Sequence, residues 1–250
     1  LICEAYNLMK DLVRMKQGDM AEEFLKWNKG PLDSFLIEIT ADILKFKDAS
    51  GEYLLPKILD KAGQKGTGKW TGISALEYGV PVTLIGEAVF ARCLSALKDE
   101  REHASKVLPS GAQPFTGDKV EFITYLRQAL YLGKLISYTQ GFMLLREAAK
   151  ANKWNLNYGG IAMMWRGGCI IRSDFLGNIK EAYDKNPKLW NLMLDPFFTD
   201  RVEKNVGALR QVVARSALVG IPAPCLGAAL SFYDGYRADT LPANLIQAQR

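Results

Sequence analysis

The chain has 250 residues, of which 48% are hydrophobic and 10% aromatic, enough for a buried core in one large domain or two small ones. Its 32 basic and 27 acidic residues are interspersed and leave a net charge of +5, which tolerates anionic small molecules without demanding nucleic acid. No RNA-recognition, zinc-finger or basic-arm pattern is present, and no uninterrupted apolar run of about 20 residues could cross a membrane. Composition therefore argues against a nucleic-acid-binding protein and a membrane-spanning one.

The cysteines give no sign of a metal or disulfide framework. They are widely spaced and form no CxxC pair: Cys3, Cys93, Cys169 and Cys225. No histidine lies close enough in sequence to complete a metal site with any of them. We expect buried free thiols, no bound metal ion, and a protein of a reducing compartment, the cytoplasm.

Both ends of the chain have the pattern of an interrupted helix. Leu1 opens inside an amphipathic pattern with no capping residue before it. The run from Leu245 to Arg250 stops without a Gly or Asn terminator. We therefore expect a fragment, with polypeptide cut away on both sides.

Apolar residues at i, i+3, i+4 spacing predict helices along most of the chain. Asp19 and Glu22 form a D-x-x-E variant of the capping box, and Gly30 with Pro31 closes the helix that follows it. Further helices are predicted, in chain order, over Leu32 to Leu44, Val82 to Leu97, Phe122 to Leu145, Tyr158 to Ala182, Arg201 to Leu218 and Leu226 to Tyr236. No period-2 strand stands out, so the predicted fold class is all-α, a large multi-helix bundle. An exposed, mobile loop is expected over Pro109 to Lys119.

A glycine-rich run is the most distinctive motif in the chain. It alternates three glycines with three polar side chains: Gly63, Lys65, Gly66, Thr67, Gly68 and Lys69. Backbone N–H groups, a hydroxyl and two ammonium groups can therefore approach one anion, and a phosphate is the natural guest. A glycine-rich turn whose lysines face water is the other reading. Chemistry alone leaves the anion site and the solvated turn equally open.

The same run only partly matches a Walker A motif. Gly63-x4-Gly68-Lys69 fits its front, but Trp70 stands where Ser or Thr must hold magnesium. The preceding residues, Ile58 to Ala62, continue a helical pattern, whereas a P-loop follows a β-strand. A nucleotide-binding P-loop is therefore not expected.

The run from Ile58 to Trp70 resembles the signature of the 6-phosphogluconate dehydrogenases: an aliphatic residue, x, Asp, two free positions, Gly or Ala, a small polar residue, then KGTGxW. Similarity extends over the rest of the chain, through Leu32 to Thr40, Val82 to Cys93, Trp165 to Ser173 and Ser231 to Arg237. The resemblance implies one domain over residues 1–250, the family's C-terminal helical domain truncated at both ends, with the N-terminal Rossmann domain absent from this chain.

The resemblance also implies an activity. Enzymes of this family oxidise 6-phosphogluconate at C3 with NADP, lose C1 as CO2 and tautomerise the enediol to ribulose 5-phosphate without a metal, in the pentose phosphate pathway. They act as homodimers with shared active sites. Their general-base lysine, acid glutamate and Rossmann phosphate loop lie before Leu1, and a tail histidine lies beyond Arg250. With no catalytic residue present, we expect residues 1–250 alone neither to hold NADP strongly nor to turn over substrate.

Four substrate-binding residues follow from the resemblance. Lys65 and Thr67 match loop positions that line the substrate site, and Arg92 matches the arginine that grips the substrate phosphate. Arg250 matches the arginine of the family's LIQAQR segment, which reaches from the partner subunit to the same phosphate. The competing class of protein is a non-enzymatic helical module that serves only for dimerisation.

Other charged side chains allow structural explanations. Arg92 lies among apolar neighbours, so it needs either an anionic ligand or an acidic partner, such as Glu77 or Glu87 in a buried ion pair. Buried ion pairs are also the favoured account of Arg166 and Arg172. His103, the single histidine, lies in a highly charged stretch and is expected to be a solvated surface group.

Overall fold

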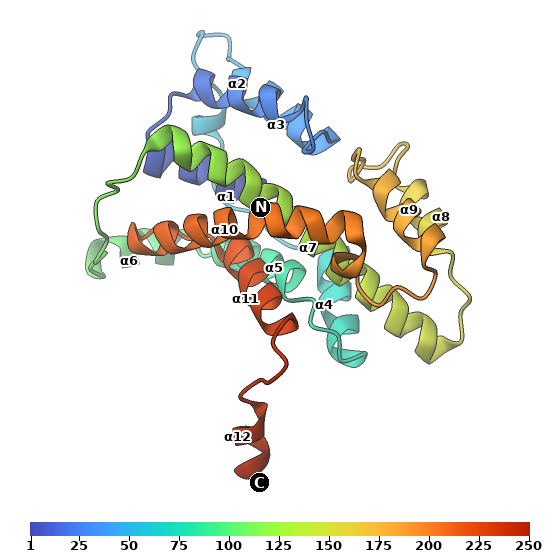
Figure 1. Cartoon of the computed structure of the whole chain (residues 1–250). Helices are drawn as coiled ribbons and strands as arrows, with labels where there is room; N and C mark the ends of the chain where they lie inside the picture. The colour runs from blue at the N-terminus through green and yellow to red at the C-terminus, as the bar shows by residue number, and fades with distance from the viewer.

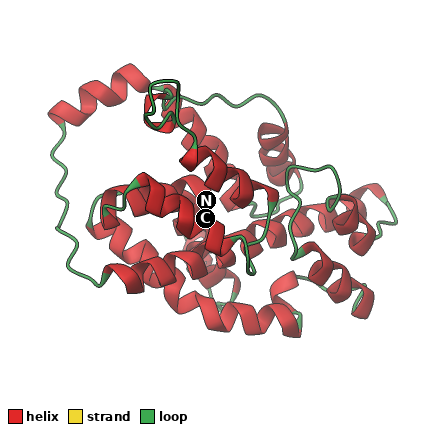
Figure 2. Cartoon of the chain, turned by 90° about the horizontal axis from the view of Figure 1, so that it is seen from above, coloured by secondary structure: helices red, strands yellow, loops and turns green.

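The computed structural model describes all residues from 1 to 250 and consists of helices and loops, with no β-strand (Figure 2). The α-helices are α1 (Ile2–Asn7), α2 (Gln17–Trp27), α3 (Phe35–Lys45), α4 (Thr67–Glu77), α5 (Thr83–Ala96), α6 (Lys98–Val107), α7 (Lys119–Asn152), α8 (Tyr158–Met164), α9 (Leu176–Lys185), α10 (Pro196–Leu218), α11 (Pro224–Tyr236) and α12 (Ala243–Ala248). A π-helical turn, Leu8–Val13, follows α1, and 3₁₀ turns lie at Leu55–Lys57 and Leu192–Leu194. The predicted all-α fold class is confirmed.

Helix α7 is the central element of the bundle. It has 34 residues and is capped at its start by Asp118, whose carboxylate accepts a hydrogen bond from the Glu121 N–H at 2.7 Å. Its C-cap is Lys153, in the left-handed conformation. It packs along α10 and against α11, α5 and α1 (Figure 1). The hydrophobic core is therefore continuous, with 44 buried residues in one cluster.

A buried amide fixes α5 against α7. Gln140 of α7 is fully buried; its Oε1 accepts from the Leu84 N–H at 2.9 Å, and its Nε2 donates to the Thr83 hydroxyl at 3.0 Å. Both halves of the amide are satisfied, so this contact stabilises the start of α5 without leaving an unpaired buried group. The rest of α5 packs between α11 and α4.

Three helix predictions were wrong in detail. Helix α2 begins at Gln17, ahead of Asp19, and no side chain caps it, so the predicted capping box does not form. The helix predicted from Tyr158 to Ala182 is interrupted between α8 and α9, where Gly168 adopts a φ of +66° that breaks the helical path. The segment Ile58 to Ala62, predicted to be helical, is irregular. The loop from Pro109 lies exposed between α6 and α7, as predicted.

The thiols are less buried than expected. Cys225 is buried, but Cys3 and Cys93 are exposed and Cys169 is intermediate, so the expectation of four buried thiols was wrong. Cys93 is exposed because α5 is a surface helix at that point. No helix is both long and apolar enough to span a membrane.

Helix α12 stands clear of the bundle. None of its residues is buried, and Figure 1 shows it projecting from the body beyond α11. Leu245 and Ile246 expose 61% and 59% of their surface. A helix this short and this exposed has no packing against the bundle to stabilise it.

Candidate functional site

The glycine-rich run becomes the start of α4. Residues up to Lys65 are irregular, Gly66 precedes the helix, and Thr67 is its first residue. No side chain caps this end, so its first N–H groups and the positive end of the helix dipole face outward. The side chains of Lys65, Thr67 and Lys69 are exposed, and neither lysine has an ion-pair partner.

Two contacts bring the glycine-rich segment of residues 59–68, here called the cationic loop, onto one face of α5. A Cβ at Gly68 would lie 2.9 Å from Cγ2 of Val89, so only glycine allows this approach. Earlier in the same segment, the Ala62 N–H donates to Ser95 Oγ at 2.9 Å. Arg92 lies midway between Val89 and Ser95 on the helix, at i+3 from one and i−3 from the other. The loop residues between the two contacts therefore pass beside Arg92.

Arg92 has no acidic partner. Its side chain is exposed and takes part in no ion pair or hydrogen bond, so the alternative of a buried pair with Glu77 or Glu87 was wrong. The apolar sequence around Arg92 suggested a buried environment, but this part of α5 faces solvent: Phe90 exposes 68% and Leu94 58% of its surface. An unpaired guanidinium thus lies beside the cationic loop, an arrangement suited to an anion.

The loop is held by a charged cluster that sequence reasoning did not identify. The Asp60 carboxylate lies 2.6 Å from Lys98 Nζ and 3.2 Å from the Arg101 guanidinium. The hydrogen bond from Lys98, with a smaller one from Arg101, lowers the pKa of Asp60, and the same contact raises the pKa of Lys98. Lys98 and Arg101 lie in a charged helix that by pattern is only a solvated surface, so no sequence signal distinguished them.

The structure brings three of the four predicted site residues to one region, but not the fourth. Arg250 is exposed just beyond the projecting α12, and no hydrogen bond or ion pair joins its side chain to the bundle. Lys65 and Thr67 lie in the cationic loop, which two contacts hold against the turn of α5 that carries Arg92. Arg250 is the C-terminal residue, at the end of the chain that projects from the body (Figure 1).

Arg166 and Arg172 do not form the buried ion pairs predicted for them. Both are exposed; Arg172 pairs with Glu38 at 3.1 Å at the surface, and Arg166 pairs with no acidic group. Both arginines lie in the irregular segment between α8 and α9, outside the core. Together with Asp33 and Asp174 they line a small polar pocket of about 220 Å³. His103 is exposed, as predicted.

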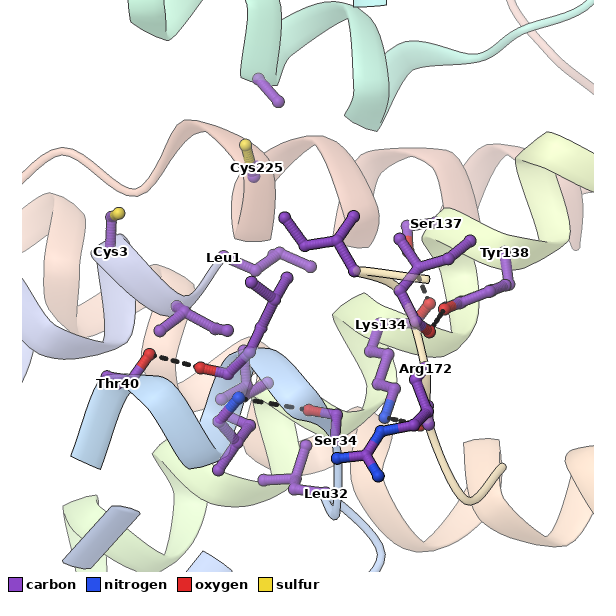
Figure 3. A pocket seen from close by; sticks show the side chains of 18 of the residues that line it. Leu1, Cys3, Leu32, Ser34, Thr40, Lys134, Ser137, Tyr138, Arg172 and Cys225 are labelled. Carbon is purple, nitrogen blue, oxygen red and sulfur yellow. Dashed lines mark hydrogen bonds between the residues drawn. The ribbon is translucent and has the colours of Figure 1, made fainter. Parts of the chain in front are cut away.

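A larger cavity of about 690 Å³ lies between Leu1, α3, α5 and α7 and is lined mainly by apolar side chains (Figure 3). Lys134 and Tyr138 are among its polar lining groups. Lys134 donates to the Ser173 hydroxyl, and burial lowers its pKa to about 8. Tyr138 donates to the Ile171 carbonyl at 2.9 Å, and burial raises its pKa to about 12. The sequence pattern marked these residues only as parts of core helices.

The chain contains no Rossmann-type site for a dinucleotide cofactor. A Rossmann site holds a pyrophosphate where a parallel β-strand turns through glycines into a helix, and this chain has no β-strand. Its glycine-rich run instead enters α4 from an irregular segment. No cluster of three or more His, Cys, Asp or Glu side chains could hold a metal ion.

Fold and site together define an all-helical domain that presents a cationic, glycine-rich loop beside an unpaired arginine. The sequence profile described as "6-phosphogluconate dehydrogenase, C-terminal domain" matches residues 1–250. The chain belongs to this family, which confirms the resemblance stated above.

Individual relatives agree with the family assignment. Proteins called 6-phosphogluconate dehydrogenase, decarboxylating, from Homo sapiens and Ceratitis capitata are 66% and 65% identical over the whole of this chain. A solved structure of Plasmodium falciparum 6-phosphogluconate dehydrogenase, described as apo, with its cofactor NADP+ and with its substrate 6-phosphogluconate, superimposes with a TM-score of 0.95 at 42% identity. It matches 100% of this chain and 54% of its own. The chain spans about half the length of the curated relatives it matches, 52% of the human protein.

Proposed function

We propose that residues 1–250 form the substrate-binding and dimerising helical domain of an NADP-dependent oxidoreductase that oxidatively decarboxylates 6-phosphogluconate to ribulose 5-phosphate. Membership of the family supports the reaction. The observation that carries the substrate assignment is the convergence of a cationic loop on Arg92, which has no acidic partner.

The chemistry of the loop suits a phosphate monoester. Arg92 offers planar, bidentate donors, Lys65 a mobile ammonium group and Thr67 a hydroxyl. The uncapped N-terminus of α4 adds backbone N–H donors on the same side. The nearby carboxylate of Asp60 is already engaged by Lys98 and Arg101, so it does not oppose an anion as a free charge would.

A second copy of the chain completes the site in this proposal. Arg250 lies on an exposed arm whose Leu245 and Ile246 have no partner in their own chain. Apolar side chains are also exposed on α4 and α5 around the loop, among them Trp70 and Phe90. Docking the arm of one copy on this surface of another would bury both apolar sets and bring Arg250 to the phosphate.

The test is ligand-dependent stability. 6-Phosphogluconate should raise the melting temperature of the chain, because it binds the folded state alone. Lys65→Ala, Thr67→Ala or Arg92→Ala should erase the rise. Lys106→Ala removes an exposed, unpaired cation from α6 and serves as the matched control that keeps it. Arg250→Ala, or dilution below the dimer dissociation constant, should reduce the rise.

The alternative function is a non-enzymatic helical dimerisation module. Its support is the exposed apolar arm, which could serve association alone. Such a module would dimerise through the arm and show no melting shift with 6-phosphogluconate at any concentration. A shift equal in wild type and Arg92→Ala would also contradict the proposed phosphate site.

A further inference from the structure

We propose that Asp60 and Ser95 are positioning residues, which hold the cationic loop at a fixed place over Arg92. This inference rests on the proposed function, because the loop matters for activity only if it binds the substrate phosphate. Neither residue would touch the substrate; each acts through the loop backbone.

The loop has no secondary structure to hold it. From Leu59 to Lys65, no backbone group bonds to another backbone group. The hydrogen bonds that fix this stretch come from side chains of α5 and α6, at Asp60 and at Ala62. Because an unsupported glycine-containing segment samples many conformations, these few contacts determine where Lys65 lies.

Ser95 ties the loop directly to the helix turn that carries Arg92. Its Oγ accepts from the Ala62 N–H at 2.9 Å and lies 3.1 Å from the Ala62 carbonyl oxygen. The same hydroxyl lies 2.7 Å from the carbonyl oxygen of Arg92 itself, so its single proton is shared between two acceptors. The position of the loop is therefore set relative to Arg92.

Asp60 provides the second anchor and is joined to the first. The Arg101 guanidinium donates to the Asp60 carbonyl at 3.1 Å and to the Ser95 carbonyl at 3.0 Å, while it also contacts the Asp60 carboxylate. Lys98 holds the same carboxylate at 2.6 Å. Asp60, Ser95 and Arg101 thus form one cluster that spans the loop, α5 and α6.

The cluster leaves the backbone at Lys65 little freedom, while its side chain stays mobile. Lys65 lies three positions after Ala62, a reach of roughly 10 Å at full extension, and three positions before Gly68, which approaches Val89. Lys65 is therefore held between two fixed points on either side of Arg92. Pre-ordering of this kind lowers the entropic cost of binding a ligand.

The experiment compares Asp60→Asn and Ser95→Ala with Glu102→Gln, which removes another carboxylate from Lys98, at 3.3 Å, without touching the loop. Amide hydrogen exchange of residues 61–68 reports the order of the loop, and calorimetry with 6-phosphogluconate reports affinity. We expect Asp60→Asn and Ser95→Ala to speed exchange and to raise the Kd, each by about tenfold or more. Glu102→Gln should leave both unchanged, and Ser95→Thr, which keeps the hydroxyl, should restore both.

The outcomes separate this inference from the proposed function. Absence of 6-phosphogluconate binding by the wild-type chain would overturn the proposed function, while exchange would still show whether the cluster orders the loop. Unchanged exchange in Asp60→Asn and Ser95→Ala would overturn the inference that these side chains order the loop. Faster exchange with an unchanged Kd would overturn the positioning role, and an equal effect of Glu102→Gln would overturn the specificity of the cluster.

Discussion

At the scale of single residues, Lys134 is the cation most affected by its surroundings. Its ammonium group donates to Ser173 and lies 5.3 Å from the ring centroid of Phe175. Burial lowers its pKa from 10.5 to about 8, opposed by the nearby carboxylates of Asp33 and Asp174. The cause is desolvation, so the charged form of Lys134 is less favourable in the folded chain than in the unfolded chain.

This gives a prediction for the pH dependence of stability. Between pH 8 and 10.5 the unfolded chain keeps the Lys134 proton while the folded chain releases it, so stability should rise with pH across this window. The slope for one full proton is roughly 1.4 kcal/mol per pH unit. Urea unfolding of the wild type and of Lys134→Met measures the two free energies of unfolding. Above pH 8, the free energy of unfolding of the wild type should rise relative to that of Lys134→Met. A difference that stays constant with pH would contradict the assigned cause.

The proposed site residues come from contiguous motifs. Lys65 and Thr67 belong to the signature run, and Arg92 to a second matching segment, so the family resemblance was enough to propose them. Ser95 and Arg101 were not predicted, because they act on loop residues 33 and 41 positions away and carry no local pattern. The side chains that position a site are therefore harder to find from sequence than those that form it.

At the scale of elements, α11 depends on a side chain from the other end of the chain. The Glu4 carboxylate accepts from the Cys225 N–H at 2.6 Å and from the Leu226 N–H at 2.9 Å. Helix α11 has no cap of its own, since Ala223 at its N-cap offers no acceptor. Glu4 is itself buried, so this contact satisfies helix N–H groups that water cannot reach.

Glu4→Ala should therefore cost about 2 to 3 kcal/mol in free energy of unfolding, because it leaves buried N–H donors without an acceptor. Denaturant unfolding measures the loss, and Glu77→Ala, at an exposed and unpaired glutamate, is the control, expected to change stability by less than about 0.5 kcal/mol. Equal effects of the two substitutions would show that the cap contributes nothing.

Helix periodicity predicted the long elements well and failed where tertiary contacts decide. Helices α5, α7 and α10 follow their apolar patterns, and each is longer than or close to its predicted span. The run after Ile58 has the same local pattern but stays irregular, since Asp60 and Ala62 bond to α5 and α6 instead of to their own backbone. The Glu4 contact spans 221 positions, beyond any local pattern.

At the scale of the whole molecule, the bundle presents two separate parts of one proposed site. The loop and Arg92 form one part on α4 and α5, and the projecting α12 carries Arg250 as the other. A single chain cannot bring them together in this conformation, which is why the proposed function includes a second copy. The all-α class followed from the helical periodicity of the sequence. The apolar pattern at α12 indicates only a helix, and it was the family resemblance that implied that Arg250 reaches another subunit.

A crystal structure of the chain with bound 6-phosphogluconate would most directly test the claim that the cationic loop and Arg92 bind the substrate phosphate. The phosphate is predicted to lie within hydrogen-bond distance of Lys65 Nζ, Thr67 Oγ1 and the Arg92 guanidinium, with Arg250 reaching it from a second copy. A phosphate bound elsewhere at saturating ligand, for example beside Arg166 and Arg172, with Lys65 and Arg92 unengaged, would contradict it.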